Sequence, residues 1–87
     1  MASYKLVFKR SVAKDLRRIP NDEVARILDR VNALQHVPRP PASEKLSGQE
    51  RYRIRQGVYR ILYEIADDVL IVTIVKVGHR RHIYRNG

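Results

Sequence analysis

The chain has 87 residues, enough for one small domain with its own core. It contains no cysteine, which excludes disulfides and thiolate metal sites, and no apolar run reaches the roughly 18 residues of a membrane-spanning helix. Its 18 Lys and Arg against 9 Asp and Glu give a net charge of +9, which favours nucleic acid or an acidic protein as a partner. We therefore expect a single soluble domain over residues 1–87, located in the reducing cytoplasm.

The first half of the chain predicts a strand followed by two helices. Residues 4–9 alternate apolar and basic side chains, which indicates a strand with one well-buried face. Ser11 and Asn21 are suitable N-caps for a short helix ending at Pro20 and a longer one reaching about His36. The longer helix carries an apolar stripe of Val24, Ile27, Leu28, Val31 and Leu34. Three prolines within residues 37–43 predict a linker across the surface.

Residues 51–66 predict a β-hairpin with cationic side chains on one face. Residues 51–55 and 58–66 alternate at period two, and Gln56–Gly57 is the expected two-residue turn. This turn pairs Arg55 with Val58 and sets Arg53 directly opposite Arg60. Like charges opposite each other are unfavourable on a sheet, so the pattern indicates an anionic ligand.

A third, almost continuously apolar strand is predicted over residues 69–77 after an Asp67–Asp68 turn, as expected of a strand that is buried on both faces or central in its sheet. The order of elements predicts an α+β fold, a small and mainly antiparallel sheet (β-α-α-β-β-β) with a helix hairpin packed on one face. The other face is expected to be open and lined by the arginines of the hairpin, with Arg80 and Tyr84 at its edge. The face toward the helices is expected to comprise Tyr52, Ile54, Tyr59, Ile61, Tyr63 and Ile65.

Arginine binds phosphate through a planar set of several donors, and unpaired bases stack on aromatic side chains, so RNA is the favoured ligand. His79 and His82 have the spacing of a possible metal-binding pair. Neighbouring arginines oppose a cation, however, and no nearby carboxylate or cysteine completes a ligand set. We therefore expect neither a metal nor another cofactor.

Four segments carry a resemblance to a known family: residues 45–48 (KLSG), 52–55 (YRIR), 57–63 (GVYRILY) and 77–81 (VGHRR). In this order and spacing they resemble the RelE toxins of the RelE/ParE superfamily. The resemblance implies the toxin of a type II toxin–antitoxin system, a ribosome-dependent endoribonuclease that cuts mRNA in the A site and inhibits translation. It also implies partnership with the 70S ribosome and mRNA, and a hetero-oligomer with an acidic, RelB-like antitoxin.

The resemblance further implies the site residues. The catalytic positions correspond to Arg55, Arg60, Arg80 and Tyr84, and the remaining residues expected to contact RNA are Arg51, Arg53, His79, Arg81 and His82. Relatives that cut mRNA often have lysine at the positions of Arg53 and Arg55. Arginine keeps its charge, so a general base at position 55 is not expected. The C-terminal helix of some relatives is also not expected, since the sequence stops at Gly87.

With no metal ligands, the expected cut is an in-line attack of the RNA 2′-hydroxyl on the adjacent phosphorus. Arg53, Arg60 and Arg80 would neutralise the developing charge, and Tyr84 would take the 2′ proton, with His79 and His82 as alternative acid or base. Two other functions stay open: a gyrase-poisoning toxin of the ParE branch, and an RNA-binding module without catalytic activity.

Overall fold

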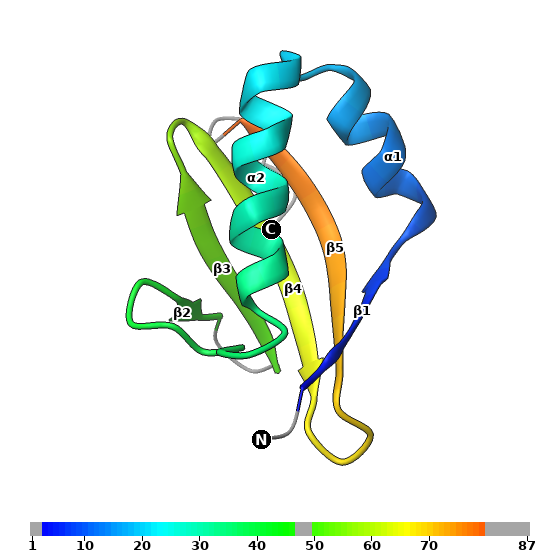
Figure 1. The fold of residues 1–87 in the computed structure, drawn as a ribbon, viewed down its shortest axis with the longest axis vertical. Helices are drawn as coiled ribbons and strands as arrows, with labels where there is room; N and C mark the ends of the chain where they lie inside the picture. The colour runs from blue at the N-terminus through cyan, green and yellow to red at the C-terminus, as the bar shows by residue number, and fades with distance from the viewer. Residues whose placement is uncertain (1–2, 47–49, 80–87) are drawn as a thin grey trace.

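A computed structural model describes residues 3–46 and 50–79, which form two helices packed on one face of a sheet (Figure 1). The elements are β1 (Lys5–Phe8), α1 (Arg10–Arg17), α2 (Asn21–Ala33), β2 (Glu44–Lys45), β3 (Arg51–Gln56), β4 (Tyr59–Ala66) and β5 (Ile71–His79). No helix of the described ranges is both long and apolar enough to cross a membrane.

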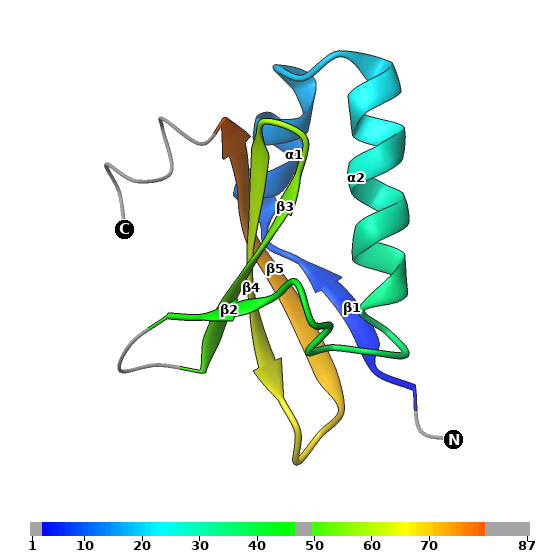
Figure 2. The ribbon, with the colours of Figure 1, turned by 90° about the vertical axis from the view of Figure 1, so that its left-hand side faces the viewer.

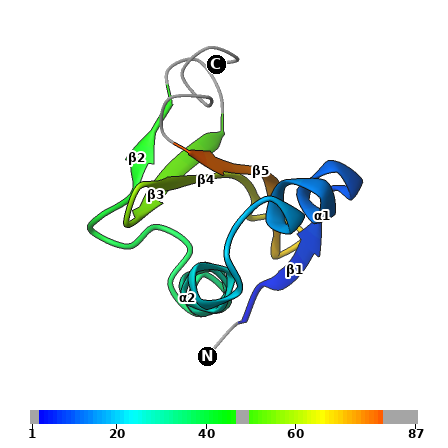
Figure 3. The same cartoon turned by 90° about the horizontal axis from the view of Figure 1, so that it is seen from above.

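The sheet has the strand order β1-β5-β4-β3-β2. β1 runs parallel to β5, whereas the β2–β3, β3–β4 and β4–β5 pairs are antiparallel. Both helices lie on the same side of the sheet (Figures 2 and 3). The predicted α+β fold and its mainly antiparallel sheet are therefore confirmed. The third apolar strand, β5, lies inside the sheet between β1 and β4, and β4 is the central strand. β5 covers residues 71–79 rather than the predicted 69–77, because Val69 and Leu70 belong to the turn after β4. The two-residue strand β2 was not predicted, because it is too short to show a pattern.

The core lies between the helices and the sheet. Ile27 and Val31 of α2 and its C-cap residue Leu34 are at most 1% exposed, as expected of the predicted apolar stripe. The predicted helix-facing side of the hairpin is also confirmed: five of its residues are buried, Tyr52, Ile54, Ile61, Tyr63 and Ile65, and Tyr59 packs against them in part.

The boundaries of the first elements differ from the prediction. α1 has Lys9 rather than Ser11 as its N-cap, because the helical conformation already begins at Arg10. Pro20 is the N-cap of α2, and this helix ends at Ala33 rather than near His36. The prediction of a well-buried face on β1 is also wrong, since Phe8 is 43% exposed. The reason is that β1 is an edge strand, which pairs only with the first residues of β5.

The turn of the β3–β4 hairpin is Gly57–Val58, one residue later than predicted. Gly57 has a φ of 61°, and a positive φ at the first central position is what a type II′ turn requires of its glycine. Consequently Gln56 pairs with Tyr59, and Arg55, not Arg53, lies directly opposite Arg60.

A β-bulge interrupts the pairing of β4 with β5. Leu62 pairs with Lys76 but Tyr63 pairs with Ile74, so β5 contains one extra residue at this point. A bulge of this kind reverses which face the following residues of the strand point to. As a result Val77, opposite Ile61, is buried in the core, although simple alternation from Ile74 would have placed it on the other face.

Candidate functional site

Arg53, Arg55 and Arg60, which we term the arginine cluster, lie on the sheet face opposite the helices. Arg55 pairs with Arg60 across the hairpin, and Arg53 is two residues from Arg55 on β3, so all three side chains are on one face. Among the described residues no helix covers this face (Figure 2). The structure therefore brings together the three hairpin arginines that the sequence had placed on a common face.

The burial of the arginine cluster differs from the expected open surface. Arg60 is only 5% exposed and the Arg53 side chain 14%, whereas the Arg55 side chain is 59% exposed. Arg60 lies on β4, which has neighbouring strands on both sides, while Arg55 is near the end of β3. The expectation of a fully open face is thus wrong for two of the three arginines. Their guanidinium groups are held by their surroundings rather than moving in solvent.

Glu44 also belongs to this site, and sequence reasoning missed it. It pairs with Arg53 across the β2–β3 ladder and so lies on the same face. Arg53 Nη2 donates a hydrogen bond of 2.7 Å to Glu44 Oε2, and Arg55 Nη2 lies 3.9 Å from Glu44 Oε1. The hydrogen bond from Arg53, followed by the charges of the neighbouring arginines, lowers the pKa of the Glu44 carboxyl. The one available signal was a lone acid just before the segment that resembles the family.

Arg51 shares the face but lies toward its other end. Its Nη2 and Nε donate to Glu64 Oε2 at 2.8 and 3.2 Å, and Glu64 is its cross-strand partner on β4. This pairing offsets the charge of Arg51, so we expect it to contribute less to anion binding than the cluster itself.

His79 lies on the other side of the sheet from the arginine cluster. It pairs with Tyr59, and the two rings make an edge-to-face contact with centroids 6.2 Å apart. Tyr59 shares the helix-facing side with Ile61, and the bulge in β5 is what turns His79 to this side. Arg80, Arg81, His82 and Tyr84, the other predicted site residues, lie outside the described residues.

A polar network joins the linker to the end of the sheet that is remote from the β3–β4 turn. Arg39 donates two hydrogen bonds to Asp67, of 3.1 and 2.8 Å, and its Nε donates to the Tyr52 hydroxyl at 2.9 Å. The Tyr4 hydroxyl donates to Asp67 at 2.7 Å. The Arg39 contacts, and then Tyr4, lower the pKa of Asp67 to about 2. Because its donors and acceptors satisfy one another, the network has a structural role.

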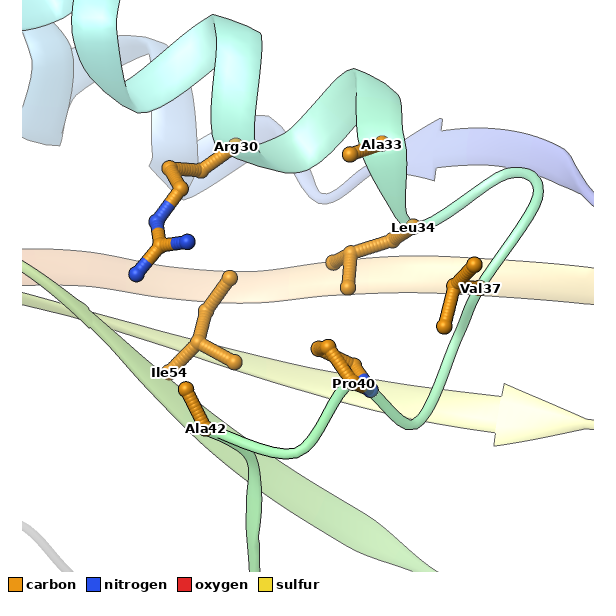
Figure 4. Close-up of a pocket in the computed structure, with 7 residues that line it drawn as sticks. All are labelled: Arg30, Ala33, Leu34, Val37, Pro40, Ala42 and Ile54. Carbon is orange, nitrogen blue, oxygen red and sulfur yellow. The ribbon is translucent and has the colours of Figure 1, made fainter.

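A small hollow with a volume of about 90 Å³ lies between α2, the linker and β3 (Figure 4). Apart from Arg30 its lining is apolar: Ala33, Leu34, Val37, Pro40, Ala42 and Ile54. Arg30 Nη2 donates to the carbonyl oxygen of Arg55 at 3.1 Å, which ties the helix to β3. Since Ile54 points to the core, the hollow lies on the helix side of the sheet and is separate from the arginine cluster.

The arginine cluster combines two nearly buried cations, Arg53 and Arg60, with one exposed cation, Arg55. Guanidinium groups bind the oxygens of phosphate through parallel hydrogen bonds, and charge that is already in place costs no reorganisation during a reaction. Arg60 pairs with Gly78, so β5 places no side chain directly opposite it on this face. The site is therefore suited to a phosphodiester.

The chain is similar in sequence to known toxins. The family model described as "ParE toxin of type II toxin-antitoxin system" matches residues 6–84. Toxin RelG of Mycobacterium tuberculosis is 31% identical over 86 residues, which are 94% of this chain and 97% of the relative.

Two solved complexes contain similar folds. The toxin–antitoxin complex RelBE2 of M. tuberculosis has a chain with a TM-score of 0.79 and 27% identity, and the match covers 91% of this chain and all (100%) of that one. The archaeal RelE–RelB complex of Pyrococcus horikoshii has a chain with a TM-score of 0.78 and 25% identity, with coverages of 90% and 96%.

Proposed function

The chain belongs to the ParE toxin family of type II toxin–antitoxin systems, as a RelE-like member of the RelE/ParE superfamily, and from this premise we propose that it cuts mRNA in the ribosomal A site. The observation that carries the proposal is the arginine cluster, three cations on a sheet face without a helix among the described residues. A toxin with this activity acts in the cytoplasm, where ribosomes are.

The proposed role of the cluster is to hold the scissile phosphate and to stabilise its transition state. Arg55 is exposed enough to meet the RNA first, while Arg53 and Arg60 are held nearly buried. A buried guanidinium acts on the developing phosphorane charge with less screening by water than an exposed one. Arg80, two residues beyond Gly78 in the chain, is proposed as a further cation of the site.

The proposed reaction needs no metal. The RNA 2′-oxygen attacks the adjacent phosphorus as a base takes its proton, and the bond from phosphorus to the 5′-oxygen breaks as that oxygen receives a proton. The products are a 2′,3′-cyclic phosphate and a 5′-hydroxyl. Tyr84 is the proposed base, since several arginines are close to it in the sequence and cations favour a phenolate. His82 is the alternative, whereas His79, on the face of Tyr59, is a weaker candidate.

The test uses 70S ribosomes programmed with a defined mRNA, with cleavage mapped by primer extension in single-turnover conditions. Arg55→Ala, Arg60→Gln and Arg80→Ala should each lower the rate, by about 100-fold where the arginine contacts the transition state. Arg17→Ala removes an exposed cation from α1 and serves as the matched control. A 2′-deoxynucleotide at the cut site should block cleavage. Cleavage of that substrate would refute attack by the 2′-hydroxyl, and full activity of all three variants would refute the site.

Gyrase poisoning is the competing function, and the name of the matching family model favours it. The relative RelG and the arginine cluster support RNA cleavage instead. Expression of the toxin in cells, followed by pulse labelling, separates the two. An arrest of translation before any DNA damage supports the proposal, and DNA damage before the arrest supports gyrase poisoning.

The proposal includes an acidic antitoxin, since the similar chains of M. tuberculosis and P. horikoshii were solved in toxin–antitoxin complexes. A net charge of +9 favours rapid association with such a partner. We expect a disordered acidic segment of the antitoxin to fold over the arginine cluster. In hydrogen exchange on the purified complex, protection of β3 and β4 supports this arrangement, and protection confined to α1 and α2 contradicts it.

A further inference from the structure

Glu44 lies where it neutralises part of the arginine cluster. Its carboxylate accepts a 2.7 Å hydrogen bond from Arg53 and lies 3.9 Å from a terminal nitrogen of Arg55. The Arg53 side chain is 14% exposed and that of Glu44 is 51% exposed, so the acid is the more accessible partner of the pair. Three arginines with one carboxylate leave a net charge of +2 on these four side chains.

The Glu44 carboxylate contacts Arg53 in the way that a bound phosphate would. A guanidinium offers the same donors to a carboxylate oxygen as to a phosphate oxygen, so the two anions compete for one position. The pKa of Glu44 is lowered first by its hydrogen bond with Arg53 and then by the surrounding arginine charges, so Glu44 is ionised at neutral pH.

The Glu44 side chain can also move away from Arg53 without disturbing the packing of the core. It lies on β2, a strand of two residues at the edge of the sheet, and its side chain is half exposed. A change of its side-chain rotamer would break its hydrogen bond with Arg53 while leaving the helix-facing core in place.

From these contacts we infer that Glu44 is a specificity-determining residue, an internal carboxylate that an RNA phosphate must displace from Arg53. The inference rests on the proposed function and deepens it. A loosely held RNA strand loses a large share of its binding energy in displacing Glu44. An RNA that makes many contacts at once loses only a small share. Glu44 therefore disfavours single strands met at random in solution.

The test measures binding of the full-length protein to a 2′-O-methyl RNA dodecamer, which cannot be cleaved by 2′-hydroxyl attack. Fluorescence anisotropy is followed at several salt concentrations between about 50 and 200 mM, where phosphate contacts dominate affinity. Glu44→Gln should bind on the order of fivefold more tightly, as expected for the removal of a surface ion pair. The salt dependence should steepen by up to about 0.7 in slope, the value of one additional phosphate contact on single strands.

Asp29→Asn is the matched control, because it removes the same charge from an exposed position on α2. Its affinity should stay within about twofold of the wild type, since charges on separate surfaces are largely screened at this salt. Equal gains from Glu44→Gln and Asp29→Asn would mean that only net charge matters, and would overturn the inference.

A double-mutant cycle that combines Glu44→Gln with Arg53→Gln shows whether Glu44 acts through Arg53. The gain from Glu44→Gln should disappear when Arg53 is already replaced. Unchanged or weaker binding by Glu44→Gln, with melting temperatures equal to the wild type, would overturn the inference alone. RNA binding that neither Arg53→Gln nor Arg55→Gln weakens would overturn the proposed RNA interface, and the inference with it.

Discussion

Replacing Ile61 by alanine deletes three side-chain carbons at the centre of the core. Ile61 is 0% exposed and pairs with Ile54 on β3 and with Val77 on β5, both of which are also buried. It lies on the helix-facing side, so its deletion leaves a cavity between the sheet and the helices without touching the arginine cluster.

The cost can be worked out from this burial. Three buried carbons are worth about 2.4 kcal/mol of transfer free energy at about 0.8 kcal/mol each. The cavity adds to this, so we expect Ile61→Ala to lower the free energy of unfolding by about 3 to 4 kcal/mol. Domains of this size have a total stability of about 5 to 13 kcal/mol. The melting temperature should fall by about 15 to 20 °C.

The measurement is urea denaturation followed by circular dichroism, together with a thermal melt. Ile61→Val should cost only about 1 kcal/mol, because one carbon is removed. Val69→Ala is the surface control, since Val69 is 58% exposed and its loss should change stability by less than about 0.5 kcal/mol. A loss below about 1 kcal/mol for Ile61→Ala would refute the assignment of this face as the core.

Three further outcomes are expected. The pKa of Asp67 is lowered to about 2, mainly by Arg39, so its contribution is present above about pH 4 and is lost as the pH falls toward 2. Urea melts from pH 6 to 2 should show Asp67→Asn less stable than wild type at pH 6, with a difference that closes near pH 2; a constant difference would contradict the pairing. Tyr63→Phe should cost about 1 to 2 kcal/mol, because the Tyr63 hydroxyl donates a 2.7 Å hydrogen bond to the Pro38 carbonyl, and an unchanged urea midpoint would contradict this. Arg55→Gln should raise the melting temperature by about 2 °C while weakening RNA binding, since it removes a like charge opposite another arginine, and a lower melting temperature would count against the repulsion.

The alternation of side chains determined the two faces of the hairpin without any knowledge of the fold. Period two is a local property of an extended chain, so it places Tyr52, Ile54 and Ile61 on one side and Arg53 and Arg55 on the other, whatever the strands pair with. The apolar stripe of α2 is local in the same way. These patterns were sufficient for the α+β fold and for the common face of the three arginines.

The register of the hairpin depended on one backbone angle. Both Gln56–Gly57 and Gly57–Val58 are possible two-residue turns by composition, and the choice decides whether Arg53 or Arg55 faces Arg60. Only the structure shows the glycine at the first central position, with its φ of 61°.

Contacts between segments that are distant in the sequence were decided by the tertiary structure alone. Arg60 is only 5% exposed, although alternation alone places it on a sheet face that no helix of the described residues covers. The carboxylate at Arg53 comes from Glu44, on a strand too short to have a period. The side on which His79 lies depends on a bulge in β5, and one extra residue inverts every later assignment by alternation. Sequence patterns report the conformation of a segment, whereas burial, pairing and register are set by whatever packs beside it.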